Sequence, residues 1–260
     1  MSNSESAVPG RAGAFTGRGV IVTGASSGIG RATARAFALA GAGVLAVGRR
    51  FEELEETAGG EPSIVPFVAD LRSDNVAQAV IDAAVREWSR IDVLVNGAGV
   101  FASMPLADST ATRIADTLAV NVTAPSLLAS AALPQLRKHG GTIVNVSSTF
   151  GHRPSPGASH YGASKAAVEQ LTRSWAAELA GEQIRVNAVA PGPTESGALV
   201  AAGLSDAMIA EIKLAEEARI PLGRRGEPGE VAEWIVRLCD PGAAWITGQV
   251  LAVDGGLALT

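Results

Sequence analysis

The chain has 260 residues, of which 47% are hydrophobic, and this is enough for one large α/β domain with a substantial core. Its net charge of −5, without any run of Lys or Arg, argues against a nucleic-acid partner. Cys239 is the only cysteine, so an intrachain disulfide is excluded and a reducing compartment fits.

The N-terminus has no charged start followed by an apolar run, which excludes a signal peptide. Residues 1–15 are predicted to form a disordered extension, and residues 16–260 the folded domain. No apolar stretch reaches ~18 residues, so no membrane span is predicted. We expect a soluble, cytoplasmic protein.

Short apolar segments rich in β-branched residues alternate with longer helical patterns along the chain. Predicted strands cover 20–23, 44–47, 64–68, 93–96, 142–146, 185–188 and 250–253. Predicted helices lie near 29–40, 74–88, 111–137, 161–180 and 228–239. This alternation indicates a parallel sheet buried on both faces. Right-handed crossovers then give a doubly wound, Rossmann-type sheet in a single domain.

The first predicted strand leads into a glycine-rich segment, T-G-A-S-S-G-I-G, at residues 23–30. Glycines at such a turn let the backbone approach a pyrophosphate and let the next helix pack on the sheet. The helix N-terminus offers free N–H groups and a partial positive charge to phosphate. The segment predicts a dinucleotide site formed by Gly24, Ser26, Ser27, Gly28, Ile29 and Gly30.

Three polar residues further along the chain suit proton transfer. Tyr161 and Lys165 are four residues apart in Y-G-A-S-K, so a helix places them on one face. Ser148 stands thirteen positions before the tyrosine (161 − 148). A free Tyr has a pKa near ~10, and a cation in a partly desolvated cleft is predicted to lower it by ~2–3. That change brings the phenol into the range useful for acid–base catalysis.

The glycine-rich segment, the Y-G-A-S-K motif and Ser148 together resemble the short-chain dehydrogenase/reductase family, over roughly residues 17–258. The resemblance implies that Tyr161 exchanges the proton and that Ser148, rather than Ser147, holds the substrate oxygen. It also implies that Lys165 holds the nicotinamide ribose. By the same resemblance Asn121 orders a water that links Lys165 to solvent, the alternative being a satisfied buried amide.

The resemblance places further cofactor contacts at strand ends. Asp70, followed by Leu71, would meet the adenine amino group. The segment V-N-G-A-G has Gly97 where the family usually has a second Asn. On the nicotinamide side the P-G turn supplies contacts. The additional residues implied are Asn96, Ala98 and Gly99 for the adenosine, and Pro191, Gly192 and Thr194 for the carboxamide.

The end of the second predicted strand bears on the choice of cofactor. An NAD enzyme would place Asp at position 48 to hold the ribose 2′-OH, and this chain has Gly48 followed by Arg49. Arg49 could grip a 2′-phosphate. Ser27 counts against this, since many NADP enzymes of the family have a basic residue there. The alternative is that Arg49 and Arg50 pair with glutamates 52–56 of the next helix. NADP(H) is predicted, with NAD as the alternative.

The segment 194–220 interrupts the alternation as an amphipathic insertion, and in the family it is the substrate lid. Its apolar residues favour a hydrophobic or aromatic ketone; they are Leu199, Val200, Leu204, Met208 and Ile209. We therefore predict an NADP-dependent carbonyl reductase or alcohol dehydrogenase without a metal. A non-catalytic dinucleotide sensor or scaffold on the same fold is the alternative, and a dehydratase or epimerase is a third possibility.

A homotetramer is predicted from the outer face of the 161–180 helix, where four apolar residues would leave more surface than a monomer exposes. They are Ala166, Leu171, Trp175 and Leu179. The C-terminal run from Trp245 to Gly256 resembles the family's second subunit interface.

Overall fold

The computed structural model describes residues 13–101, 103–196 and 205–260, and within them seven strands form one parallel sheet. The strand order is β3-β2-β1-β4-β5-β6-β7, so the predicted doubly wound sheet is confirmed. The strands are β1 (Gly19–Thr23), β2 (Gly43–Gly48), β3 (Ile64–Val68), β4 (Val93–Asn96), β5 (Thr142–Val146), β6 (Arg185–Pro191) and β7 (Val250–Val253).

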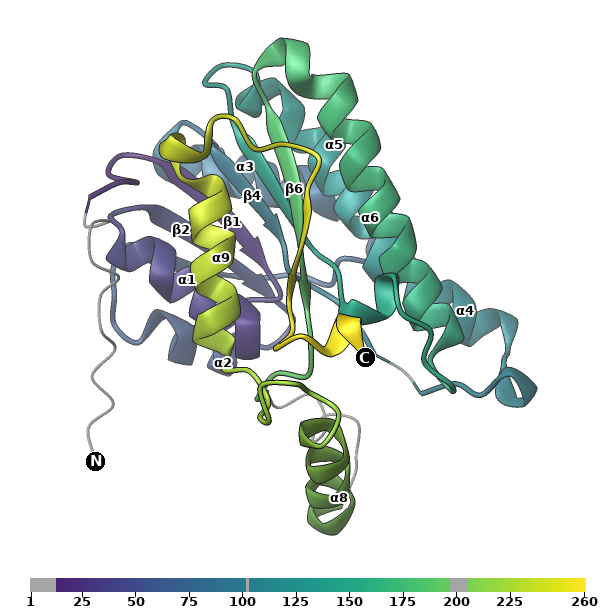
Figure 1. Cartoon of the computed structure of the whole chain (residues 1–260). Helices are drawn as coiled ribbons and strands as arrows, with labels where there is room; N and C mark the ends of the chain where they lie inside the picture. Colours follow the sequence, from purple (N-terminus) through teal and green to yellow (C-terminus); the bar gives the residue numbers. More distant parts are fainter. Residues whose placement is uncertain (1–12, 102, 197–204) are drawn as a thin grey trace.

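Helices cover both faces of the sheet (Figure 1). One face carries α1 (Gly28–Leu39), α2 (Phe51–Ala58) and α9 (Pro228–Cys239). The other carries α3 (Val76–Trp88), α5 (Ala124–Leu136) and α6 (Ser159–Leu179). The shorter α4 (Ala111–Leu118) precedes α5, and α8 (Asp206–Glu217) projects away from the sheet within the predicted lid segment.

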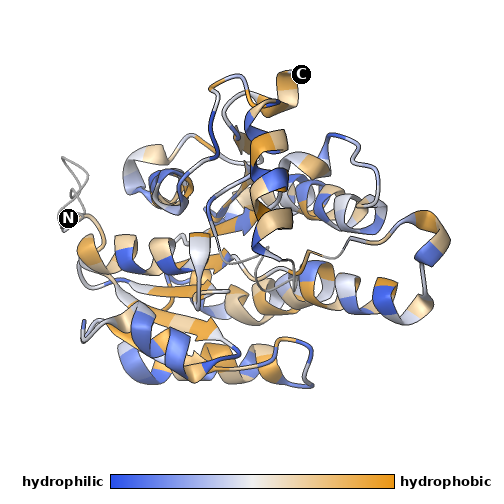
Figure 2. Ribbon diagram, turned by 90° about the horizontal axis from the view of Figure 1, so that it is seen from below, coloured by the Kyte–Doolittle hydropathy of each residue, from blue (hydrophilic) through white to orange (hydrophobic). Residues whose placement is uncertain are grey.

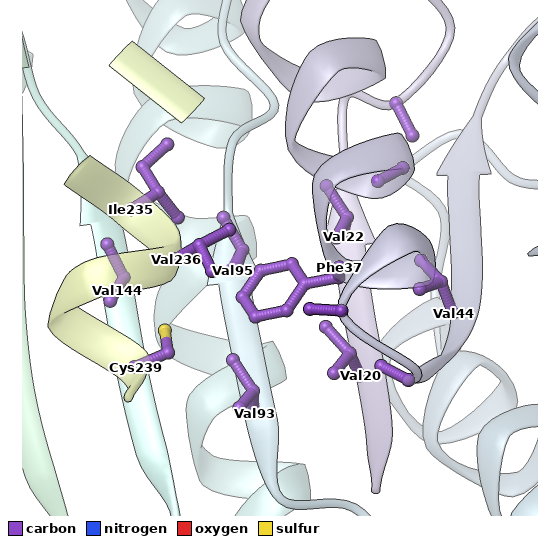
Figure 3. Packing of buried hydrophobic residues seen from close by; sticks show 14 of the residues in the cluster. Val20, Val22, Phe37, Val44, Val93, Val95, Val144, Ile235, Val236 and Cys239 are labelled. Carbon is purple, nitrogen blue, oxygen red and sulfur yellow. The ribbon is translucent and has the colours of Figure 1, made fainter. Parts of the chain in front are cut away.

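Side chains of each strand alternate between the two cores, as the two-residue period of a strand requires. In β1, Val20 and Val22 join the core under α1 and α9, whereas Ile21 joins the core under α3 and α5. The Phe37 ring lies between valines of the sheet and α9 (Figure 3). Hydrophobic residues accordingly concentrate on the strands and on the helix faces turned toward them (Figure 2).

The predicted helix at 111–137 is interrupted by one π-helical turn, Ala119–Thr123, between α4 and α5. By length and composition alone the 26-residue segment Ala111–Leu136 could cross a membrane, since 18 consecutive residues within it have a mean hydropathy of 1.3. This corrects the sequence expectation that no stretch is long and apolar enough. In the fold, its Leu128, Ala132 and Leu136 are buried against α3 and the sheet. Core packing therefore accounts for these three residues, and 39% of the apolar stretch is buried inside the structure.

Two further sequence expectations need correction. Phe15, predicted to lie in the extension, is fully buried and packs edge-on against Phe37 with ring centroids 5.0 Å apart. The folded domain therefore includes Phe15, because burying an aromatic ring stabilises its attachment to the core; residues 1–12 lie outside the described residues. On α6, Leu179 is buried and Trp175 packs on the same core, so these two do not belong to an outer apolar face.

The Thr23 hydroxyl at the end of β1 is expected to be important for stability. It accepts hydrogen bonds from the backbone N–H groups of Gly97 and Ala98, both at 3.1 Å, after β4. Thr23→Val leaves both partly buried N–H groups without this acceptor, and an unpaired group costs ~1–3 kcal/mol, so the loss should be about 2–6 kcal/mol. Urea unfolding measures it. Thr23→Ser keeps the hydroxyl and is the control; equal destabilisation by both variants would contradict the assignment.

Candidate active site

A cavity of about 510 Å³ opens where the loops after β1 and β4 diverge at the carboxyl edge of the sheet. The chain runs from β1 toward β2 and β3 on one side and from β4 toward β5 on the other, so this is the switch point of the sheet. Of the predicted cofactor residues, those lining the cavity are Gly24, Ser26, Ser27, Gly28, Ile29, Gly30, Arg49, Asp70, Leu71, Ala98, Gly99, Tyr161, Lys165, Pro191, Gly192 and Thr194.

The loop after β1 has the shape that a pyrophosphate site requires. Gly24 has a φ of +72°, and a Cβ there would lie 2.8 Å from the Ala98 Cα. A Cβ on Gly30 would lie 2.1 Å from the Gly24 carbonyl oxygen, so α1 can approach the loop only without a side chain. Ser27 begins α1 without a side-chain hydrogen bond to the helix end. The N-terminus of α1 faces the cavity, and these residues fit a dinucleotide phosphate.

The two arginines after β2 have different partners. Arg50 pairs with Glu53 at 2.5 Å, as the alternative interpretation of this segment expected. Arg49 is exposed, lines the cavity, and makes no hydrogen bond or ion pair within the described residues. Hydrogen bonds from Arg72 are the main cause of the lowered pKa of Asp70, and the charge of Arg49 adds a smaller contribution. Arg49 is therefore a cation at the cavity wall with an uncommitted guanidinium.

Asp70 is already paired in this structure. Its carboxylate accepts hydrogen bonds from the Arg72 side chain, at 2.6 and 3.0 Å, and from the Arg72 backbone N–H. These bonds lower the pKa of Asp70 from 3.8 to about 2. The carboxylate at the cavity wall is consequently ionised at neutral pH and oriented by Arg72.

Asn96 is the one predicted cofactor residue that the structure does not bring to the cavity. Its Nδ2 donates to the Asn145 Oδ1 at 2.9 Å, across β4 and β5, and the side chain is buried. Gly97, which replaces the family's usual second Asn, has no room for a side chain, because a Cβ would lie 2.6 Å from the Thr23 carbonyl oxygen. The loop after β4 lines the cavity from Gly97 to Phe101, and at Gly97 it does so with backbone alone.

The predicted catalytic residues Ser148, Tyr161 and Lys165 come together in one wall of the cavity. Ser148 follows β5, its hydroxyl accepts from the Phe150 N–H at 3.2 Å, and it lies close enough to the Tyr161 phenol to favour the ionised form of that group. One turn further along α6, the Lys165 Nζ donates to the Val146 carbonyl at 2.8 Å and lies 5.8 Å from the centre of the Tyr161 ring. This arrangement places a phenol between a hydroxyl and a cation.

The pKa of Tyr161 moves in the direction opposite to the sequence prediction. Burial of the phenol raises its pKa above the usual value, and the nearby Ser148 hydroxyl only partly offsets this. Burial also lowers the pKa of Lys165 from 10.5 to about 8. Both changes have the same cause, since a charged group loses solvation in the cavity wall. The chain's own groups therefore keep Tyr161 protonated and able to donate a proton.

Asn121, the fourth predicted catalytic residue, lies outside the cavity lining in the π-helical turn. Its Oδ1 accepts from the Val100 N–H at 2.9 Å, and its Nδ2 donates to the Val100 carbonyl and to the Ser164 hydroxyl. The amide is thus fully paired and buried, which is the alternative that the sequence left open. Through Val100 and Ser164 it ties the loop after β4 to α6.

Sequence reasoning missed Arg225, a buried cation beside the lid. It pairs with Glu195 at 2.8 Å and with Glu216 of α8, and it donates to the Thr194 carbonyl at 2.7 Å. Lys213 of α8 pairs with Glu195 as well. These ion pairs attach α8, in the predicted lid segment, to the loop after β6. No sequence motif marks Arg225, because its partners are brought together only by the fold.

Comparison with known proteins identifies the family. Residues 24–258 match the family model described as enoyl-(acyl carrier protein) reductase. The chain is 37% identical over 248 residues to the 3-oxoacyl-(acyl-carrier-protein) reductase FabG of Thermotoga maritima, covering 94% of this chain and 98% of that one. It is 38% identical over 250 residues to the cis-4-hydroxycyclohexanecarboxylate dehydrogenase of Sinomonas cyclohexanicum, with 94% and 97% covered.

Solved structures agree. A short-chain dehydrogenase/reductase of unknown function from Caenorhabditis elegans, determined with cofactor, has a TM-score of 0.87 at 35% identity, covering 95% of this chain and 97% of that one. A 3-ketoacyl-(acyl-carrier-protein) reductase from Brucella melitensis, complexed with NADH, has a TM-score of 0.87 at 31% identity, covering 94% and 99%. The chain belongs to the short-chain dehydrogenase/reductase family and is an oxidoreductase.

Proposed function

We propose that this protein interconverts a ketone and a secondary alcohol with NADP(H), acting as a carbonyl reductase or alcohol dehydrogenase. The observation that carries the proposal is the Ser148–Tyr161–Lys165 group in the wall of a cavity that begins at the glycine-rich loop. Relatives named as a 3-oxoacyl reductase and as a hydroxycyclohexanecarboxylate dehydrogenase support the same bond as the target. A bound nicotinamide would supply or accept the hydride.

The residues around the cavity have distinct parts in this reaction. Tyr161 donates its proton to the carbonyl oxygen during reduction and takes it back during oxidation. Ser148 donates a hydrogen bond to the same oxygen and stabilises the charge that develops there. Lys165 places a positive charge beside the phenol and favours its ionised form once the proton has left.

Two aromatic rings beside Tyr161 support an apolar substrate. Phe101 lies edge-on to the Tyr161 ring with centroids 5.1 Å apart, and Phe150 lies edge-on from another side at 6.4 Å. Both line the cavity, and Phe101 is half exposed. We therefore propose a bulky apolar ketone. Of the lid residues that first suggested this, Leu199, Val200 and Leu204 lie outside the described residues.

Tyr161→Phe tests the catalytic assignment. The variant keeps the ring and its packing against Phe101 and removes the proton donor, so turnover should fall by ~10²–10⁴. Cofactor affinity, measured by fluorescence titration, should stay close to that of the wild type. A variant with more than about a tenth of wild-type turnover would contradict the role. Wild-type protein that binds cofactor but reduces no carbonyl compound would instead favour the sensor.

The uncommitted guanidinium of Arg49 supports NADP(H) over NAD(H). Gly48 offers no carboxylate to hold a 2′-OH, and a charge-assisted pair between Arg49 and a 2′-phosphate would contribute ~1.5–3 kcal/mol. Ser27 supplies no second cation at the glycine-rich loop. The Brucella relative complexed with NADH keeps NAD as the alternative.

The cofactor preference can be measured as kcat/KM for both cofactors. The wild type should prefer NADPH by about tenfold, and Arg49→Ala should remove this preference while leaving NADH use nearly unchanged. Gly48→Asp should reverse it through repulsion of the phosphate. Because a Cβ at Gly48 lies 3.2 Å from the Leu54 Cδ2, Gly48→Ala is the control for crowding. Equal or better use of NADH by the wild type would overturn the proposal.

We also propose a homotetramer, supported by the C-terminal run from Trp245 that the sequence indicated and less by the outer face of α6, from which Trp175 and Leu179 are removed. Trp245 is fully exposed, and Ile246 and Leu259 near the C-terminus are exposed as well. Leu118 of α4 and Leu127 of α5 are further exposed apolar side chains. Apolar surface of this extent favours association. Light scattering should give four times the mass of the chain at micromolar concentration, and a monomer alone would contradict the proposal.

A further inference from the structure

Glu169 is a buried carboxylate that the proposed reaction does not use. It lies on α6 two turns after Tyr161 and one turn after Lys165, and its side chain is only 5% exposed. A buried ionised carboxylate is costly unless hydrogen bonds or charges compensate it. Its partners therefore show what holds it in place.

All but one of the partners lie in the segment that carries Ser148. The Oε1 of Glu169 accepts a hydrogen bond from the Ser147 hydroxyl at 3.0 Å, immediately before Ser148. The same oxygen lies 3.0 Å from the His152 Nδ1, just after the short turn Thr149–Gly151. The Oε2 faces Arg173 on α6 at 3.7 Å. One carboxylate oxygen thus holds the chain on both sides of Ser148.

The turn Thr149–Gly151 packs so closely against α6 that two glycines at the contact have no room for a side chain. A Cβ on Gly151 would lie 2.5 Å from the Glu169 Oε1, and one on Gly162 would lie 2.8 Å from the Phe150 carbonyl oxygen. The Ser147 hydroxyl also approaches the Lys165 carbonyl oxygen at 3.3 Å. Helix and turn therefore meet backbone to backbone, and Glu169 lies at their contact.

We propose that Glu169 is a positioning residue, whose carboxylate fixes the Ser148 hydroxyl relative to Tyr161 through Ser147 and His152. The inference rests on the proposed function, since it concerns the geometry of the same reaction. Tyr161 and Glu169 are both on α6, and Glu169 holds the segment from Ser147 to His152. A shift of that segment relative to α6 would therefore change the distance between the Ser148 hydroxyl and the Tyr161 phenol. Misplacement of a reacting group by about 1 Å can cost up to ~10²-fold in rate.

Glu169→Met and Glu169→Gln test the proposal. Met fills a similar volume without an acceptor, and kcat should fall about tenfold or more while cofactor affinity stays unchanged. Gln keeps an oxygen that can accept from Ser147 and His152, and it should restore most of the activity. Val168→Ala is the matched control, because it removes buried carbons from the same helix without touching a hydrogen-bonding group. It should lower stability and leave kcat unchanged.

A double-mutant cycle shows whether Glu169 acts through Ser148. Glu169→Met should cost about tenfold in the wild type and less than about twofold in Ser148→Ala, because coupled residues do not act additively. Additive losses, or equal activity of the Met and Gln variants, would overturn the proposal.

Tyr161 is the only tyrosine in the chain, so its ultraviolet phenolate absorbance reports its ionisation without any turnover. The nearby Ser148 hydroxyl lowers the pKa of Tyr161, so Glu169→Met should raise the titration midpoint and Glu169→Gln should leave it near the wild type. Identical midpoints in wild type and Glu169→Met would count against the inference. This readout stands even if the wild type reduces no carbonyl compound, which would refute only the proposed function.

Discussion

The site depends on the close approach of two loops at the point where β1 and β4 part. Thr23 ends β1 and accepts hydrogen bonds from the N–H groups of Gly97 and Ala98 after β4. The approach leaves no room for a side chain at Gly24 or Gly97. These two loops form the floor of the cavity. The N-terminus of α1 faces one end of the cavity, and α6 forms a wall at the other end.

The second constraint is the burial of charge along α6. Lys165 and Glu169 are one turn apart, and both are nearly inaccessible to solvent. Each is compensated by the segment that leaves β5, Lys165 through the Val146 carbonyl and Glu169 through Ser147 and His152. Polar groups at the carboxyl end of β5 thus stabilise two charges on α6. Ser148 lies among these groups in the sequence, between Ser147 and His152. This pairing links the stability of the helix to the geometry around Tyr161.

The predicted lid segment is held to the domain in part by ion pairs, whereas the sheet and its helices are held together by apolar packing. Residues of α8 are partly or fully exposed, and its described contacts with the domain include the ion pairs among Glu195, Lys213, Glu216 and Arg225. Arg225 is buried, whereas its carboxylate partners are about one-third exposed.

The sequence by itself determined the sheet, the two helical layers and the motifs that line the cavity. Strand and helix periods are local properties, and the spacing of Tyr161 and Lys165 fixes their common face on α6 whatever surrounds them. The tertiary structure decided which groups meet. In the fold the Asn121 amide forms hydrogen bonds with Val100 and Ser164, and Asn96 forms one with Asn145. Phe15 and Leu179 are buried. The tertiary structure also determined that the pKa of Tyr161 is raised and not lowered. Desolvation depends on everything packed around the phenol and not only on its neighbours along the chain.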